Sequence, residues 1–377
     1  MRSVGVEEEL LLVNADDGQP QPVAGQVLAR AGAEPGAAVA RGAGALTAEF
    51  MQEQLELQTP PVQEMDELHR ELRKWRDCAN RAAQDLDCAV AALGTSPVRA
   101  LPTAVDSPRY RAMHREFGLL AREQLTCGCH VHVGVSSDEE GVAVLDRIRV
   151  WLPVLLALSA NSPFWAGQDS GYSSHRWLVM SRWPAAGPLA CLGSAAAYHR
   201  LVDSLVESGV LLDHGMLYFD ARLSHRFPTV EVRVADVCLD VEDTVVLAAL
   251  SRALVDTAAT QWRRRVDAPA MPNELLRMAT WRAAHEGVGG TLLHPHTGRP
   301  TPAEDVVDLL VRHVHAALEA SGDLSRVLQG LARIRARGTG SVVQRRLLAR
   351  GGDPAAVVAA AVRLTAGTAD EDVARRG

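Results

Sequence analysis

Val4-Gly5-Val6-Glu7-Glu8-Glu9-Leu10, close to the N-terminus, decides the fold. Apolar and acidic residues are mixed in this stretch, and the apolar residues continue to Val13, so we expect a strand over 4–13. Successive side chains of a strand point to opposite faces of its sheet. Glu7 and Glu9 therefore lie together on one face, and Glu8 lies on the other. The stretch predicts a sheet with paired carboxylates on one face.

Four further segments repeat this alternation of aliphatic and polar side chains. We expect strands over 53–59, 129–135, 217–223 and 229–236. Opposite their aliphatic residues these segments carry Gln54, Glu56, Gln58, His130, His132, Tyr218, Asp220, Arg222, Glu231 and Arg233. The strands come singly or as a hairpin, without regular alternation with helices. That order favours an α+β fold with an antiparallel sheet over a doubly wound parallel one.

Helical periodicity covers much of the remaining chain. Apolar residues at helical spacing, beginning with Leu68, Leu72 and Trp75, predict a long helix over 62–93. Further helices are expected over 139–158, 195–208, 241–266, 272–286, 303–320, 323–336, 341–350 and 354–365. The length is ample for a large core. We expect a single catalytic domain over 1–377, in which residues from about 300 to 377 form a helical covering part.

The charge and the basic residues limit the chemistry. The net charge is −7 and the isoelectric point is about 6.0, so no overall basic field favours nucleic acid. Lys74 is the one lysine among 39 basic residues, and the chain has no Gly-Lys-Ser/Thr sequence of a Walker loop. A bound phosphate would therefore be held by arginine and a metal ion. With no secretion signal and no long apolar run, we expect a cytoplasmic protein without a membrane partner.

The polar residues of the five strands are of the kinds that bind metal ions and anions. Carboxylates with imidazole suit Mg²⁺ or Mn²⁺, and crowded carboxylates repel one another unless a cation lies between them. A half-solvated sheet would also alternate, but usually with Thr, Ser and Lys outside. His130 and His132 could instead begin a zinc hydrolase site, in which the glutamates would be surplus. Cys127 and Cys129 are a weak zinc signal and are more simply two small residues entering a strand.

Two loops carry residues that could bind substrate. The first is a polar and aromatic stretch from Asn161 to Trp177, in which Arg176 could hold a substrate carboxylate. The second runs from Arg337 to Ser341, where backbone amides at a helix start could meet an anion. The second loop is equally well explained as a turn that ends a helix.

Several motifs, in order along residues 2 to about 350, resemble one known family. They are Val4 to Leu10, Glu56-Leu57-Gln58-Thr59-Pro60, Cys127 to Gly134, Ala160-Asn161-Ser162-Pro163-Phe164-Trp165, Tyr218-Phe219-Asp220-Ala221-Arg222 and Thr229 to Asp236. Together they resemble the type 2 glutamate–cysteine ligase family, also described as YbdK-like carboxylate–amine ligases. The resemblance implies the glutamine synthetase/guanido kinase type of catalytic fold, an antiparallel sheet with helices packed on one face.

The resemblance also implies a reaction and a set of site residues. ATP would phosphorylate a carboxylate, such as the γ-carboxylate of glutamate, and an amine, such as that of cysteine, would attack the acyl phosphate, with Mg²⁺ or Mn²⁺ bound. By motif position the metal ligands are Glu7, Glu9, Glu49, Glu56, His132 and Glu231, with Glu53 as an alternative to Glu49. Arg233 and Arg222 would contact the transferred phosphate, and Arg176 and Tyr172 would bind substrate. A homodimer is expected from the resemblance.

One local departure bears on the substrates. Where the family tends to read Gly-Tyr-x-Ser-Tyr-Arg, this chain has Gly171-Tyr172-Ser173-Ser174-His175-Arg176. The departure leaves the physiological acid and amine open, although it does not affect the expected fold. Two other interpretations stay open as well: a phosphotransferase of guanido kinase type, and a non-catalytic protein that binds a metal or a nucleotide.

Overall fold

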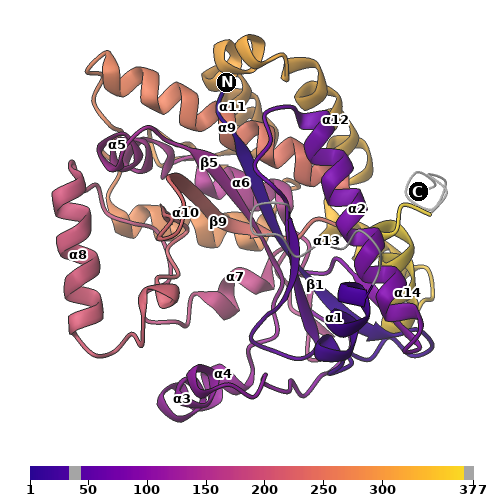
Figure 1. Ribbon diagram of the computed structural model, residues 1–377. Helices are drawn as coiled ribbons and strands as arrows, with labels where there is room; N and C mark the ends of the chain where they lie inside the picture. Colours follow the sequence, from indigo (N-terminus) through magenta and orange to yellow (C-terminus); the bar gives the residue numbers. More distant parts are fainter. Residues whose placement is uncertain (34–43, 369–377) are drawn as a thin grey trace.

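The computed structural model describes residues 1–33 and 44–368, and its centre is a seven-stranded sheet (Figure 1). The strand order is β2-β3-β1-β5-β9-β8, β4 also pairs β1, and all these pairings are antiparallel. The strands of this sheet are β1 Val4–Asn14, β2 Ala45–Ala48, β3 Gln54–Gln58, β4 Cys88–Ala91, β5 Gly128–Gly134, β8 Ala221–Leu223 and β9 Thr229–Asp236. Two small hairpins are formed by β6 Phe164–Trp165 with β7 Gln168–Asp169 and by β10 Thr291–Leu293 with β11 Pro300–Pro302.

Helices make up most of the remaining described chain. They are α1 Ala24–Ala33, α2 Met65–Gln84, α3 Pro108–Phe117, α4 Leu119–Arg122, α5 Asp138–Ile148, α6 Leu152–Ser159, α7 His175–Met180, α8 Ala195–Glu207, α9 Val241–Arg263, α10 Asn273–Glu286, α11 Ala303–Ser321, α12 Leu324–Arg337, α13 Gly340–Ala349 and α14 Pro354–Thr365, with a 3-10 turn η1 at His214–Met216. Within the described ranges, no helix has both the length and the apolar character needed to cross a membrane.

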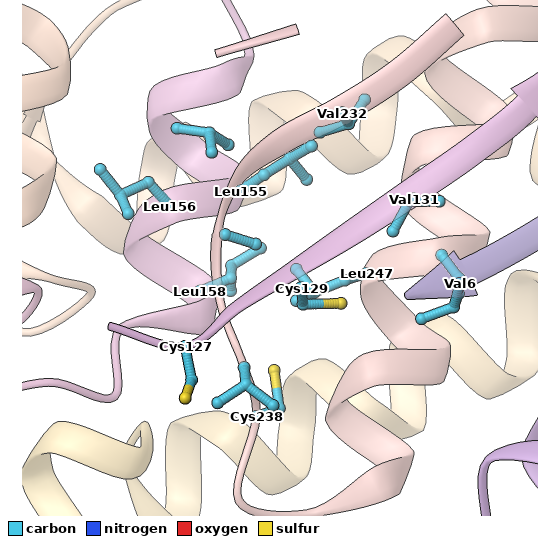
Figure 2. Packing of buried hydrophobic residues seen from close by; sticks show 14 of the residues in the cluster. Val6, Cys127, Cys129, Val131, Leu155, Leu156, Leu158, Val232, Cys238 and Leu247 are labelled. Carbon is cyan, nitrogen blue, oxygen red and sulfur yellow. The ribbon is translucent and has the colours of Figure 1, made fainter. Parts of the chain in front are cut away.

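The aliphatic side of the sheet is buried under helices. Helix α9 packs on β1 and β5, α6 packs on β9, and α2 contacts β1 and β3. Figure 2 shows Leu155 of α6 and Leu247 of α9 beside Val131 and Val232 of the sheet. Cys127, Cys129 and Cys238 lie in the same buried layer, as Figure 2 also shows. Burial raises the pKa of all three thiols well above its usual value, so they behave as small core residues.

This architecture confirms the predicted α+β class with an antiparallel sheet. Alternation also assigned the faces of β1 correctly. Glu8 is fully buried on the helix side, where Arg76 of α2 donates to both of its carboxylate oxygens at 2.7 and 2.8 Å. Glu7 and Glu9 lie on the opposite side, which faces away from the core.

The predicted helix over 62–93 was wrong at its C-terminal end. Helix α2 ends at Gln84, Asp87 has a positive φ of 53°, and the chain then forms β4 beside β1. All residues of β4 are buried. A short apolar run that is buried on both faces has no strand periodicity, so Val90 and Leu93 fitted the helical spacing by coincidence.

Two other predicted elements were too long. The expected helix over 139–158 is broken between α5 and α6, because Pro153 has no N–H to donate to the preceding turn and instead occupies the first turn of α6. The expected strand over 217–223 is reduced to β8, since Gly187 forms an isolated bridge to Phe219. The short elements β2, α3, α4 and α7 were not predicted.

The last helices pack on the helix layer rather than on the polar side of the sheet. Helices α11 and α12 contact α9, and α14 contacts β4. At the start of α13, the Ser341 amide donates to the Ala160 carbonyl at 2.9 Å. Arg337 pairs with Asp240 at 2.9 Å and with Asp243. The loop considered for anion binding therefore has protein partners, at the start of α9 and just after α6.

Candidate active site

The polar side of the sheet brings together residues that lie far apart in the sequence. The register places Glu9 opposite Glu56 and Glu7 opposite His130. Glu231 lies between two partners, His132 on β5 and Arg222 on β8. Directly opposed side chains of antiparallel strands have Cβ atoms about 5 Å apart. The sheet therefore makes direct neighbours of carboxylates, imidazoles and guanidinium groups from five strands.

Two sets of atoms on this face have the composition of divalent-cation sites. One set comes from Glu7, His132 and Glu231, and the other from Glu7, Glu56 and His130. In each set the ligand atoms lie within 4.8 Å of one another, and the described part of the chain contains no third set of this kind. Carboxylate oxygens with one imidazole nitrogen suit Mg²⁺ or Mn²⁺. The residues present therefore fit the metal ions that the resemblance implies.

The two histidines converge on Glu7. Nδ1 of His132 lies 2.9 Å from Oγ1 of Thr229, and Nε2 of the same ring lies 3.4 Å from Oε1 of Glu7. Nδ1 of His130 lies 3.3 Å from Oε2 of Glu7. Glu7 is therefore common to both clusters. Sequence reasoning assigned His132 as a ligand but not His130, although strand alternation had placed both on this face.

The carboxylates of this face perturb one another. Burial, and then repulsion by Glu7 and the neighbouring acids, raises the pKa of Glu56 well above its usual value. Burial and the charge of Glu9 raise the pKa of Glu49 to about 7. For Glu7, burial is outweighed by the two adjoining histidines, His130 and His132, which hold its pKa well below the usual value. Crowded acids of this kind are stabilised when a cation lies between them.

Glu231 connects the cation clusters to two arginines. Arg222 donates to both of its oxygens, at 2.8 and 3.2 Å, and Arg233 donates to Oε1. Burial alone would raise the pKa of Glu231, but Arg233 and Arg222 outweigh it and lower that pKa. Nη1 of Arg233 also lies 3.4 Å from Nδ1 of His130. Arg233 is thus the cation that borders both clusters, where it can meet a phosphate.

A pocket opens beside these clusters and combines charged with aromatic residues. Its walls are Glu9, Glu49, Phe50, Gln54, Arg109, Tyr110, Met113, Gln124, Thr126, His130, Arg176, Met180, Trp183, Tyr218 and Arg233. Three arginines and two glutamates share this lining with aromatic and methionine side chains. Such a lining can hold a small zwitterionic molecule with a short apolar part.

Arg176 enters this pocket from α7, and its guanidinium is almost completely buried. Nη1 lies 3.8 Å from Oδ1 of Asp236, and Nε has no hydrogen-bond partner among the described residues. A Cβ atom on Gly128 would lie 2.1 Å from Nη2 of Arg176, so only glycine leaves room for this side chain. The Gly128 amide in turn donates to Oε2 of Glu9 at 2.6 Å. A buried guanidinium with a free donor is suited to a substrate carboxylate.

Two further predicted residues lie away from the clusters. Tyr172 stacks edge-on against His285 of α10, with ring centroids 5.1 Å apart, and does not line the pocket. Glu53, the alternative to Glu49, accepts the Thr103 amide at 3.0 Å with each of its oxygens. Glu49 itself lies beside Glu9 in the pocket wall. The structure thus brings together the other predicted residues, with Arg222 at the edge.

Arg109 is a pocket residue that sequence reasoning missed. It lies in the first turn of α3 and donates to Asp213 at 2.6 and 3.0 Å. The signal for this helix was present, because Ser107 accepts the Tyr110 amide as N-cap and Pro108 follows it. Helix α3 carries few buried apolar residues, so its periodicity was weak.

Three solved structures share this fold. The glutamate–cysteine ligase of Francisella tularensis, solved in complex with AMP, has a TM-score of 0.69 at 14% identity, covering 98% of this chain and 89% of that one. A bifunctional glutathione synthetase from Pasteurella multocida also has a TM-score of 0.69, at 16% identity, covering 97% of this chain and 52% of that one. The ligase PafA, in complex with the ubiquitin-like protein Pup, has a TM-score of 0.51 at 13% identity, covering 93% and 68%. This chain therefore shares its fold with three proteins that are named as ligases or synthetases.

Sequence comparison identifies the family. The model of glutamate–cysteine ligase family 2 matches residues 3–375, and the chain belongs to this family. A Streptomyces coelicolor protein named "Putative glutamate--cysteine ligase 2" is 52% identical over 365 residues, covering 97% of this chain and 99% of that protein. A Streptomyces avermitilis protein with the name "Putative glutamate--cysteine ligase 2-1" is 50% identical over 368 residues, covering 97% and 100%. These matches confirm the resemblance found in the motifs.

Proposed function

We propose that this protein is an ATP-dependent carboxylate–amine ligase that works through an acyl phosphate, with glutamate as the acid and cysteine as the amine. Membership of glutamate–cysteine ligase family 2 supports the substrates, and the AMP in the Francisella tularensis ligase supports the nucleotide. Mg²⁺ or Mn²⁺ would be held by Glu7 with His132 and Glu231, and by Glu7 with Glu56 and His130.

One observation carries the proposal: two cation clusters share Glu7, and Arg233 lies between them and the pocket that contains Arg109 and Arg176. Phosphoryl transfer needs neutralisation of the phosphate charge and alignment of the attacking oxygen. Bound divalent ions supply part of that neutralisation. Arg233 supplies a fixed positive charge at the border, since its neighbouring acids Glu231, Glu7 and Glu9 raise its pKa despite burial.

The reaction then needs two displacements on the pocket side. A carboxylate oxygen of the acid attacks the γ-phosphorus of ATP, and the bond from phosphorus to the ADP oxygen breaks. The amine nitrogen next attacks the acyl carbon, the carbon–oxygen bond to phosphate breaks, and the amine loses a proton. Burial of Arg176 and of the pocket's aromatic side chains excludes water, which would otherwise hydrolyse the acyl phosphate.

Phosphate release from ATP tests this proposal. The wild-type protein with Mg²⁺ is mixed with ATP and a matrix of acids and amines, beginning with L-glutamate and L-cysteine. A ligase releases phosphate at full rate only when both substrates are present, and an amide product accumulates. A stable phosphorylated product with one acceptor alone would indicate a phosphotransferase instead. Because His175 stands where the family tends to have tyrosine, the matrix includes other amino acids and amines.

A further inference from the structure

Asp220 lies just beyond the residues assigned so far. The amide of Arg233 on β9 donates to the Asp220 carbonyl at 2.8 Å, which continues the ladder in which Arg222 opposes Glu231. Asp220 is therefore directly across from Arg233 and, by alternation, on the same polar side of the sheet. Side chains opposed in this way have Cβ atoms about 5 Å apart.

The Asp220 carboxylate is buried without a full set of partners. Its residue is 6% exposed, and Oδ2 has no hydrogen-bond partner among the residues that the structure describes. Burial raises the pKa of Asp220 to about 7, and the Trp177 indole, Arg176 and Arg277 offset this only in part. Neither arginine forms an ion pair with Asp220 in the described ranges, although each is close enough to influence it. A buried polar atom left without a partner requires an explanation.

The surroundings of Asp220 suggest what the missing partner is. Asp220 lines a small cavity that shares Arg176, Met180, Tyr218 and Arg233 with the main pocket. This cavity is therefore lined by one carboxylate and two guanidinium groups. Arg233 pairs with Glu231 and Arg176 lies 3.8 Å from Asp236, whereas Asp220 forms no ion pair with either arginine in the described ranges. An α-amino acid carries the complementary charges, an ammonium group and a carboxylate on one carbon atom.

We propose that Asp220 binds the α-ammonium group of the amino acid that is phosphorylated, while Arg176 binds its α-carboxylate. This inference rests on the proposed function and adds the recognition of the acid substrate to it. The carboxyl group to be phosphorylated lies beside Arg233, at the border of the cation clusters.

The test compares amino acids with the same acids lacking the amino group. Phosphate release is measured for L-glutamate against glutarate, and for L-aspartate against succinate, with Mg²⁺, ATP and L-cysteine as the common amine. The wild type prefers the amino acid of at least one pair. Asp220→Asn lowers kcat/KM for that amino acid by about 10-fold or more, mainly through KM, as expected for loss of a charged hydrogen bond. The value for the deaminated acid stays within about twofold.

Asp243→Asn is the matched control, because Asp243 is also a buried aspartate but pairs with Arg337 on the helix side. Its preference between the two acids of a pair stays that of the wild type. The inference is overturned if Asp220→Asn lowers kcat/KM equally for both acids of a pair. It is also overturned if the variant differs from wild type only in the pH dependence of kcat/KM, which would indicate a base acting on the amine.

Wild type alone also decides the question if Asp220→Asn does not fold. A wild type that uses glutarate as well as glutamate, and succinate as well as aspartate, contradicts the role of Asp220 and leaves the ligase proposal intact. Failure of the ligase proposal would give a different result: the wild type would release no phosphate with any combination of acid and amine.

Discussion

Glu7 and Glu8 are neighbours on one strand, yet they face two different environments. Glu8 is completely buried on the helix side, where Arg76 meets both of its oxygens and Thr244 donates to Oε1 at 2.7 Å. Arg76 also donates to the carbonyls of Cys238 and Leu239. Glu7 meets the imidazoles of His130 and His132, at 3.3 and 3.4 Å, and belongs to both cation clusters, beside Glu56 and Glu231.

The difference teaches that pairing, rather than burial, separates a structural carboxylate from a functional one in this molecule. On the helix side, Glu8 has a cation and hydrogen-bond donors supplied by the protein. On the polar side, burial raises the pKa values of Glu56, Glu49 and Asp220, and neighbouring acids add to this for Glu56 and Glu49. The protein's own cations do not balance these effects. A metal ion or a substrate ammonium group can supply the missing positive charge.

The largest effect is expected when the ion pair of Glu8 with Arg76 on the helix side is broken. Glu8→Gln leaves the Arg76 charge buried without its partner, and we expect a loss of about 3–5 kcal/mol in the free energy of unfolding. Urea denaturation measures this loss, while kcat of the folded enzyme stays near wild type. The double variant Glu8→Leu with Arg76→Leu recovers much of the stability, because neither charge then remains buried. A loss below about 1 kcal/mol for Glu8→Gln would contradict the structural role.

The same substitution one residue earlier is expected to act on chemistry. Glu7→Gln removes a ligand from both clusters, and we expect kcat for Mg-dependent phosphate release to fall about 100- to 1,000-fold, equivalent to about 2.7–4 kcal/mol. The free energy of unfolding stays within about 1 kcal/mol of wild type. Turnover within about threefold of wild type would show that Glu7 is not a metal ligand.

Metal binding provides a third way to separate the two faces. Mg²⁺ at 100 times its Kd stabilises the wild type by about 2.7 kcal/mol, since it binds the folded state alone. Thermal unfolding with Mg²⁺, and again after EDTA, measures this effect. Glu7→Gln loses the stabilisation, whereas Glu8→Gln keeps the Mg²⁺-dependent increment on its lower baseline. An equal increment in wild type and Glu7→Gln would contradict the cluster assignment.

The smallest effect concerns pH and Asp220. Its pKa is about 7 when folded and 3.8 when unfolded, so the folded state binds more protons between those values and stability falls as pH rises from about 4 to 7. Above pH 7 the destabilisation is complete. Asp220→Asn removes it, and we expect the variant to be more stable than wild type at pH 8 by on the order of 2 kcal/mol.

Urea denaturation at pH 5 and pH 8 checks this prediction. The stability difference between Asp220→Asn and wild type should be larger at pH 8 than at pH 5. A difference that is the same at both values would mean that Asp220 does not titrate in this window. A less stable variant at pH 8 would show that Asp220 stabilises the fold, as Glu8 does.

Strand alternation in the sequence determined much of the architecture. It separated Glu7 from Glu8, placed His130 on the same face as His132, and led to the antiparallel α+β sheet that the structure contains. Alternation succeeds here because the pleat has a period of two and does not depend on distant partners. It also placed Asp220 on the polar side, although no role could be given to it from sequence.

Only the tertiary structure decided which of these polar residues meet. The shared position of Glu7 depends on the register of β1 against β5, and the partners of Glu231 depend on β8 lying beside β9. Register and strand order arise from packing over the whole chain, for which local sequence has no signal.

The same reason explains what sequence reasoning missed. Arg109 reaches the pocket from a helix with little apolar periodicity, and β4 was hidden in a run that also fitted a helix. The sequence by itself determined the kinds of chemistry on each face. The fold decided which charges are neutralised by the protein and which remain for metal and substrate, because pairing is a property of neighbours in space.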